Sequence, residues 1–166
     1  IKVNTYYEDM DPNIAGRLLT KLDKIVQDYQ VPVVDLIKVQ TNDPYKVLIA
    51  TILSARTKDE VTAARVSELF KIAPDMNSLA KLTQKRIEKI IFPVGFFKTK
   101  AKHLKELPQV LDNLYNGQIP QTVEELCELP GVGRKTANLV VAVGFDKPAI
   151  CVDTHVHRIT NIWGLV

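Results

Sequence analysis

The feature that most constrains the fold is a dense apolar run that follows the dipeptide Asp43-Pro44. An aspartate before a proline is typical of a helix start, because the carboxylate can cap backbone N–H groups and proline needs no partner in the first turn. The following residues, as far as Leu53, are apolar on nearly every side of a helix. The run therefore predicts a central helix that is buried on most of its surface.

Shorter patterns with the helical period fill most of the remaining chain. They lie after Asp11-Pro12 and over residues 61–70, 79–82, 87–91, 101–115 and 138–143, and Gly144 is placed to end the last of them. Thr122 and Glu125 have the spacing of a capping box that opens a further short helix. Since no credible β-hairpin alternation separates these patterns, we expect an all-helical fold.

The helical pattern breaks near residues 41–42 and 146–148, which divides the chain into two expected parts. Residues 43–149 should form a lobe of six helices, and residues 1–42 and 150–166 should form a second helical lobe. A last helical pattern begins near Asp153 and is cut short at Val166, so we expect the second lobe to be incomplete in this chain.

Composition and charge narrow the class of protein. No apolar segment approaches the roughly 20 residues of a membrane span or resembles a signal peptide, so we expect an intracellular protein. Cys127 and Cys151 are the only cysteines and lack metal-ligand spacing. The net charge is +3, yet residues 81–105 hold eight Lys/Arg against one acid, Glu88, which leaves −4 for the rest. Such asymmetry suits a face that meets phosphates, although a solvated basic helix face explains it equally well.

The most informative segment is LPGVGRKTAN at residues 129–138, where a short helix meets a Pro/Gly turn that opens a second helix. Gly131 and Gly133 let the backbone turn tightly and approach a ligand, and the amides at the following helix start can bind a phosphate. This is the form of a helix-hairpin-helix, which holds DNA by its backbone without reading bases. A glycine-rich turn between packed helices is the alternative, and the Arg-Lys-Thr that follows favours the DNA-binding reading.

Four segments together resemble the endonuclease III family of DNA glycosylases, within the helix-hairpin-helix superfamily. They are LPGVGRKTAN at 129–138, VDTHVHR at 152–158, LSARTKDEVT at 53–62 and PVGFFKTKA at 93–101. The resemblance extends over most of residues 43–166. It implies the helix-hairpin-helix glycosylase fold and a role in base-excision repair.

The resemblance implies that Lys135 is the catalytic nucleophile and Asp153 the catalytic carboxylate. The neutral lysine amine would displace the damaged base at C1′ and form a Schiff base with the opened sugar, after which β-elimination cleaves the strand. Asp153 would stabilise positive charge on the sugar and help to move protons, and its position before Thr154 also predicts a helix N-cap. A lysine that only contacts phosphate is the alternative for Lys135.

The same resemblance implies residues that hold the duplex and fill the gap left by an extruded base. Arg56 stands where relatives have a glutamine, and Phe96 is an aromatic suited to wedging, although a core position explains Phe96 nearly as well. His155 could bind a sugar or phosphate, or be a structural histidine. The expected DNA-binding set is Arg56, Phe96, Leu129, Gly131, Val132, Gly133, Arg134, Thr136 and His155.

Family members usually carry a 4Fe-4S cluster on four cysteines near the C-terminus, and none of these four is in this chain. We therefore expect the cluster in the full-length protein only, and no cofactor is required for the chemistry. The expected partner is double-stranded DNA with a damaged base or an abasic site, bound by a monomer that does not meet a membrane. The expected location is the prokaryotic cytoplasm or, in a eukaryote, the nucleus or mitochondrion.

The favoured activity is that of a bifunctional glycosylase and abasic-site lyase acting on oxidised or ring-damaged pyrimidines such as thymine glycol. A mismatch or oxidised-purine glycosylase of the same superfamily is the first alternative. Lys135 bears on this choice, because monofunctional relatives generally place another residue there. A non-catalytic helix-hairpin-helix module is the second alternative, and Asp153 argues against it because a phosphate clamp needs no such carboxylate.

Overall fold

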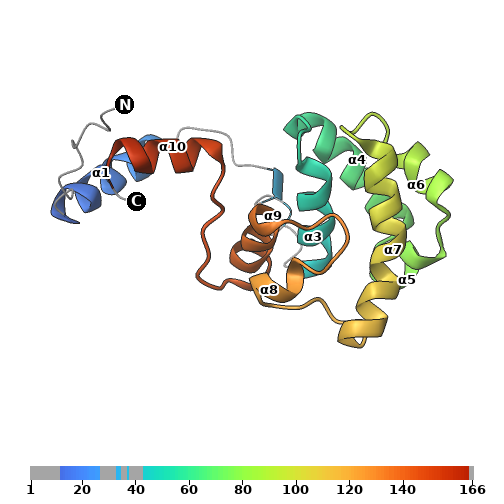
Figure 1. Cartoon of the computed structure of the whole chain (residues 1–166). Coiled ribbons are helices and arrows are strands. Elements are labelled where there is room, and N and C mark those ends of the chain that lie inside the picture. The colour runs from blue at the N-terminus through green and yellow to red at the C-terminus, as the bar shows by residue number, and fades with distance from the viewer. Residues whose placement is uncertain (1–11, 27–32, 35–36, 38–42, 165–166) are drawn as a thin grey trace, which may run out of the picture. The chain divides into compact units, whose positions relative to one another are not determined.

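A computed structural model of the chain describes residues 12–26, 33–34, 37 and 43–164 (Figure 1). The described helices are α1 (Pro12–Val26), α3 (Pro44–Ser54), α4 (Asp59–Ile72), α5 (Met76–Lys81), α6 (Gln84–Ile91), α7 (Phe97–Tyr115), α8 (Val123–Leu126), α9 (Arg134–Leu139), the π-helical segment η1 (Val140–Gly144) and α10 (Thr154–Ile162). No strand occurs among these described residues, which confirms the all-helical prediction. Within the same residues, none of the helices is both long enough and apolar enough to span a membrane.

The chain folds as two compact units. The larger unit is Val31–Cys151, and the smaller one combines Ile1–Gln30 with Val152–Val166. The larger unit begins before the break expected near residues 41–42, because Val33 and Val34 are buried in its core. The lobe expected over residues 43–149 lies within this larger unit.

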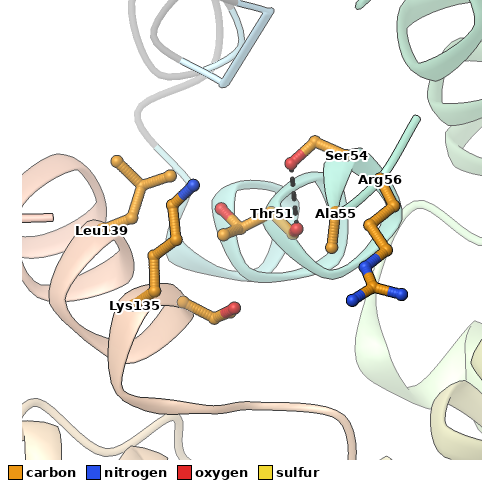
Figure 2. A pocket seen from close by; sticks show the side chains of 7 residues that line it. Thr51, Ser54, Ala55, Arg56, Lys135 and Leu139 are labelled. Carbon is orange, nitrogen blue, oxygen red and sulfur yellow. Dashed lines mark hydrogen bonds between the residues drawn. The ribbon is translucent and has the colours of Figure 1, made fainter. Parts of the chain in front are cut away.

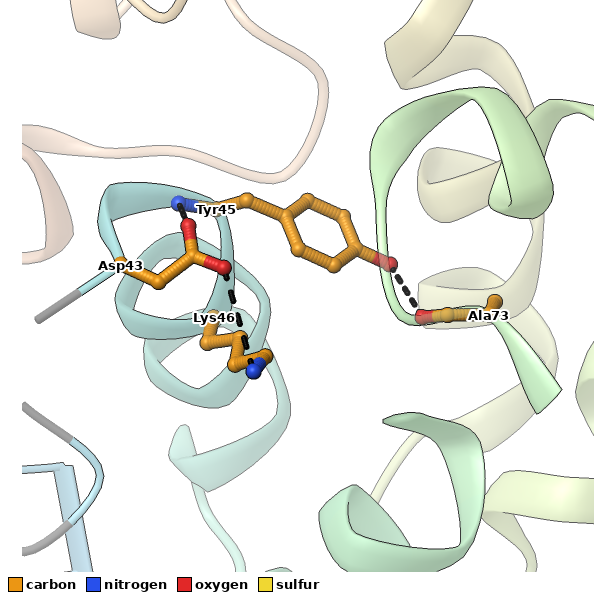
Figure 3. Close-up of polar contacts among 4 residues, drawn as sticks. All are labelled: Asp43, Tyr45, Lys46 and Ala73. Carbon is orange, nitrogen blue, oxygen red and sulfur yellow. Dashed lines mark hydrogen bonds and ion pairs between the residues drawn. The ribbon is translucent and has the colours of Figure 1, made fainter. Parts of the chain in front are cut away.

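Helix α3 is the centre of the larger unit, as its apolar sequence predicts. Its residues from Val47 to Leu53 are all buried, and the helix packs against α4, α7, α9 and η1 (Figure 1). Asp43 caps the helix by accepting a hydrogen bond from the Tyr45 N–H at 2.9 Å. The buried Tyr45 hydroxyl donates to the Ala73 carbonyl at 2.9 Å, which ties α3 to the end of α4 (Figure 3).

Helix α7 is the longest described helix and covers α5 and α6. Its buried residues recur at the helical period and are Lys100, Ala101, Leu104, Leu107, Pro108 and Leu111. The short helices beside it begin at side-chain caps, since Asp75 accepts from the Ser78 N–H at 2.7 Å and Thr83 from the Arg86 N–H at 3.3 Å. Lys100 is a charged residue on the otherwise apolar face of α7 and is the exception to its amphipathic pattern.

The chain returns to α3 through α8, a tight turn and α9. Thr122 accepts a hydrogen bond from the Glu125 N–H at 3.3 Å, which confirms the predicted cap of α8. Helix α9 continues without a break into η1, which ends at Gly144 as the sequence predicts. The sequence does not predict that residues 140–144 adopt the wider π-helical form.

The smaller unit holds α1 and α10. Among their described side chains several large apolar ones are exposed, including Leu19 at 58% and Ile162 at 69%. Helix α10 buries none of its side chains. Among the described residues of this unit, α10 has a side-chain cap at Asp153 but no buried side chain.

Candidate active site

A small pocket of about 140 Å³ lies between α3 and α9 and contains the predicted nucleophile. Its lining residues are Thr51, Ser54, Ala55, Arg56, Lys135, Thr136 and Leu139. Figure 2 shows Lys135 extending from α9 toward α3, with the Arg56 side chain at the other end of the pocket. Two of the predicted site residues that are far apart in the sequence, Arg56 and Lys135, therefore share one cavity.

The position of Lys135 depends on how the hairpin enters α9. Gly131 has a φ of +80°, and a Cβ there would lie 2.6 Å from Nδ1 of His103, so only glycine fits this turn. The Val132 N–H donates to the Leu129 carbonyl at 3.1 Å and closes the turn. Gly133, whose backbone is extended, is the N-cap of α9, and the helix begins at Arg134. Lys135 is the second residue of that helix and is exposed.

The members of the predicted hairpin set differ in exposure. The side chains of Leu129 and Val132 are buried in the core, so contacts of these residues with DNA would have to use the backbone. Gly133 and Arg134 are exposed, and a Cβ at Gly133 would meet no atom within 4 Å. The open space at Gly133 is the one expected where a ligand backbone approaches closely.

Two loops meet beside the pocket, and both have strained backbone. Arg56 and Phe96 are non-glycine residues in the left-handed region, with φ of 53° and 57°. The Arg56 guanidinium carbon lies 5.5 Å from the centre of the Phe96 ring, a cation–π distance. Phe96 is 63% exposed, which excludes the alternative that it is a core aromatic.

The close approach of these loops requires a glycine. The Gly95 N–H donates to the Thr57 hydroxyl oxygen at 3.1 Å. A Cβ on Gly95 would lie 2.5 Å from the carbonyl oxygen of Arg56, so a side chain there would push the loops apart. The close approach of the two loop backbones thus brings Arg56 and Phe96 together.

The sequence interpretation did not single out Lys100, which the structure buries beside the Arg56 loop. Lys100 is 7% exposed, and its ammonium donates to the carbonyls of Leu53 at 2.8 Å and Ala55 at 2.6 Å. Burial lowers the pKa of Lys100 to about 8. The helical period gives this position away, because Lys100 lies four and seven residues before the buried apolar residues Leu104 and Leu107. Its charge therefore cannot serve the phosphate-facing role expected of residues 81–105 as a group.

Asp153 and His155 belong to the smaller unit. The Asp153 carboxylate accepts hydrogen bonds from the N–H groups of His155 and Val156, each at 2.9 Å, which confirms the predicted N-cap of α10. The His155 side chain is exposed. The partnership of Asp153 with Lys135 of the larger unit stays a prediction.

The described residues do not fit a 4Fe-4S cluster. Nowhere in the part of the chain that the structure describes do three or more His, Cys, Asp or Glu side chains gather as metal ligands would. Cys127 and Cys151 are both partly buried. No step of the chemistry is therefore assigned to a cluster.

Comparison with known proteins identifies the family. Residues 49–166 match the family described as HhH-GPD superfamily base excision DNA repair protein. Endonuclease III of Thermotoga maritima is 47% identical over 124 residues, which cover 75% of this chain and 58% of that protein. The chain thus spans little more than half the length of this relative.

Solved structures show the same fold. A trapped covalent intermediate of endonuclease III with DNA, described as an estranged-adenine complex, superposes with a TM-score of 0.78 at 34% identity, over 89% of this chain and 67% of that one. A thermostable thymine-DNA glycosylase superposes with a TM-score of 0.76 at 28% identity, over 91% of this chain and 69% of that one. The protein belongs to the HhH-GPD superfamily of base excision DNA repair proteins and has the endonuclease III fold.

Proposed function

We propose that the protein is a bifunctional DNA glycosylase and abasic-site lyase that removes damaged pyrimidines. The observation that carries this proposal is the pocket that Lys135, directly after the hairpin, shares with Arg56. A primary amine in a cavity next to a DNA-holding turn can reach a sugar carbon that has been rotated out of the duplex. A simple phosphate clamp requires no such cavity.

The chemistry proceeds through a covalent intermediate on Lys135. The neutral amine attacks C1′, the bond between C1′ and the base breaks, and the base leaves with the electron pair and takes up a proton. The amine loses its proton and the sugar ring opens, which leaves a Schiff base between Nζ and C1′. Loss of a C2′ proton then expels the 3′ phosphate by β-elimination, and water releases the lysine.

Asp153 is proposed to assist the departure of the base. Its carboxylate can stabilise the positive charge that develops on the sugar and can accept a proton from the lysine ammonium. The two backbone hydrogen bonds that it accepts as an N-cap hold the carboxylate in one orientation. This role requires Asp153 to face the Lys135 pocket when DNA is bound.

The duplex is proposed to be held at two places. The backbone of the hairpin, from Gly131 to Thr136, contacts phosphates, which fixes the register without reading sequence. Arg56 and Phe96 occupy the space that the extruded nucleotide leaves in the stack, because an exposed aromatic and a guanidinium stacked on it suit a gap between bases. Phosphate-dominated binding should weaken steeply as salt rises.

The test of this proposal is borohydride trapping. Duplex DNA with a single thymine glycol is mixed with the protein, and borohydride reduces any Schiff base to a stable adduct. We expect an adduct with the wild-type protein, none with Lys135→Ala, and a normal amount with Lys71→Ala, which removes an exposed lysine from α4. An adduct that survives Lys135→Ala would refute the role of this lysine, and no adduct with the wild-type protein would favour a DNA-binding module.

Asp153 is tested in the same assay with a matched substitution. Asn is as good an N-cap as Asp, so Asp153→Asn keeps α10 in place and removes only the charge. The rate of trapping should fall by about 100-fold, the size of a lost general acid–base contribution. An unchanged rate would assign Asp153 to helix capping alone.

The structural likeness to a thymine-DNA glycosylase supports a second candidate, the removal of thymine from a mismatch. The two functions differ in the products, because a monofunctional enzyme leaves an intact abasic strand. A duplex with a G·T mismatch, compared with the thymine glycol duplex at equal protein concentration, separates them. Faster release of thymine from the mismatch would replace damaged pyrimidines as the proposed substrate.

A further inference from the structure

The buried ammonium of Lys100 is the group that the proposed chemistry leaves unexplained. Burying a lysine removes its ammonium from water, which costs free energy, and a methionine would fill a similar volume with a smaller free-energy penalty. The lowered pKa of Lys100, about 8, reflects that cost. A buried charge at this position therefore has to be explained by the groups to which its ammonium donates hydrogen bonds.

Lys100 holds the end of α3 and the loop that follows it. Its three N–H donors match three acceptors, namely the carbonyls of Leu53 at 2.8 Å and Ala55 at 2.6 Å and the hydroxyl of Thr57 at 3.3 Å. The two carbonyls lie at and just beyond the last turn of α3, where helix carbonyls lack intrahelical partners and a cation is favoured. One buried side chain therefore satisfies acceptors on both sides of Arg56.

The same network reaches the second loop. The Thr57 hydroxyl donates to the Ala55 carbonyl at 3.3 Å and accepts from the Gly95 N–H at 3.1 Å. Arg56 lies between Ala55 and Thr57 with a φ of 53°, a conformation that costs a non-glycine residue free energy unless its neighbours impose it. The contacts on either side of Arg56 are those that Lys100 makes or supports.

We infer that Lys100 is a positioning residue that holds Arg56 over Phe96 and at the edge of the Lys135 pocket, and through Arg56 sets the preference for damaged over intact DNA. The inference rests on the proposed function, because it assumes that this pocket receives the extruded nucleotide. Lys100 itself does not touch DNA, since it is buried under the loop that it holds.

The experiment is a double-mutant cycle on DNA affinity. Equilibrium dissociation constants are measured for a duplex with a tetrahydrofuran abasic analogue and for the same duplex without it, and their ratio is the selectivity. The complete chain is used as wild type, Lys100→Met, Arg56→Ala and the double variant. Lys71→Met is the control, because it removes an equal charge from an exposed position in the same unit.

Lys100→Met should lower the selectivity about tenfold, within the range of couplings between residues in one network. In the Arg56→Ala background the same change should lower it by less than about twofold, because Lys100 acts through Arg56. Lys71→Met should leave the ratio unchanged. A role confined to stability would reduce the amount of folded protein and lower both affinities equally, so the ratio would not move.

Thr57→Val keeps the inference testable if Lys100→Met fails to fold. It removes one hydroxyl from the network and leaves the lysine its two carbonyls, so selectivity should fall in the same direction by a smaller factor. Independent, additive effects of Lys100→Met and Arg56→Ala, or an unchanged ratio in Lys100→Met and Thr57→Val, would overturn the inference.

The binding measurement needs no chemistry, which separates this inference from the proposed function. If the wild-type protein forms borohydride adducts but Lys100 and Arg56 show no coupling, only the inference is overturned and the proposed function stands. Coupling without any adduct would reject the lyase activity alone. Equal affinity of the wild-type protein for both duplexes would overturn the inference, because there would be no selectivity for Lys100 to set.

Discussion

Helices α3 and α10 both begin at an aspartate cap, yet they are held in opposite ways. Asp43 and Asp153 each accept backbone hydrogen bonds at 2.9 Å at the start of their helix. Beyond the cap, α3 buries every residue from Val47 to Leu53, whereas α10 buries none. A cap starts a helix equally well in both places, but only the core determines where α3 lies.

This difference bears on the two proposed catalytic residues. Lys135 stands on α9, which packs against α3 and η1 in the larger unit, so the core orients its backbone. Asp153 caps a helix of the smaller unit that has no buried side chain among its described residues. The larger unit should therefore tolerate little change in its interior, and the smaller one should depend on local hydrogen bonds.

The largest expected effect is at the centre of α3. Leu48→Ala removes a side chain that is 0% exposed, and the transfer and cavity terms together should lower the free energy of unfolding by about 2–5 kcal/mol. Ile162→Ala, at a residue of α10 that is 69% exposed, should change it by less than about 0.5 kcal/mol. Chemical denaturation monitored by circular dichroism measures both. Equal losses at the two sites would contradict the comparison.

The next effect concerns the hairpin, where two positions require glycine for different physical reasons. Gly131→Ala forces a Cβ against the ring of His103 at a positive φ, so stability should fall by about 1–3 kcal/mol. Gly133→Ala meets no atom and should change stability by less than about 0.5 kcal/mol, while weakening DNA binding by blocking the close approach of a phosphate. Thermal melting and a DNA titration test the pair. A stable Gly131→Ala variant would show that the turn is not held by its packing on α7.

A smaller effect is expected at Tyr45, where a buried hydrogen bond joins α3 to Ala73 (Figure 3). Tyr45→Phe leaves the Ala73 carbonyl without this donor and should cost about 1–2 kcal/mol near neutral pH. Burial raises the pKa of Tyr45 above its usual value. The neutral phenol thus contributes stability that is complete below about pH 10 and is lost as pH rises through the folded-state pKa.

The pH dependence distinguishes this tyrosine from others. A hydrogen bond to Glu128 raises the pKa of the partly buried Tyr115 to about 12, so Tyr115 also titrates in alkali. The difference in unfolding free energy between wild type and Tyr45→Phe removes that background and should shrink above about pH 10. If this difference in unfolding free energy stays constant to higher pH, the pKa of Tyr45 is not raised by folding, and Tyr45 remains accessible to hydroxide.

The smallest effect is expected at the cap of α10. Asp153→Ala should destabilise the helix by about 1 kcal/mol, whereas Asp153→Asn should change it by only a few tenths. Hydrogen exchange of the His155 and Val156 amides reports this locally, because their N–H groups donate to the Asp153 carboxylate. Unchanged exchange in Asp153→Ala would mean that contacts other than the cap hold the start of α10.

Much of the fold follows from local rules. The apolar run after Asp43, the cap at Thr122 and the end of a helix at Gly144 depend on residues within a few positions of one another, and the structure has all three. The burial of Lys100 follows from the same rule, since it shares the helical register of Leu104 and Leu107. Counting its charge with the surrounding basic residues concealed its burial.

What the sequence alone determined was the set of helices, the hairpin and the family to which Lys135 and Asp153 point. Only the tertiary structure decided which other side chains lie next to these residues. Arg56 stacks on Phe96 and shares a pocket with Lys135 because α3 packs against both α7 and α9. Contacts between distant segments depend on the packing of whole helices against a common core, and no pattern of neighbouring residues encodes them directly.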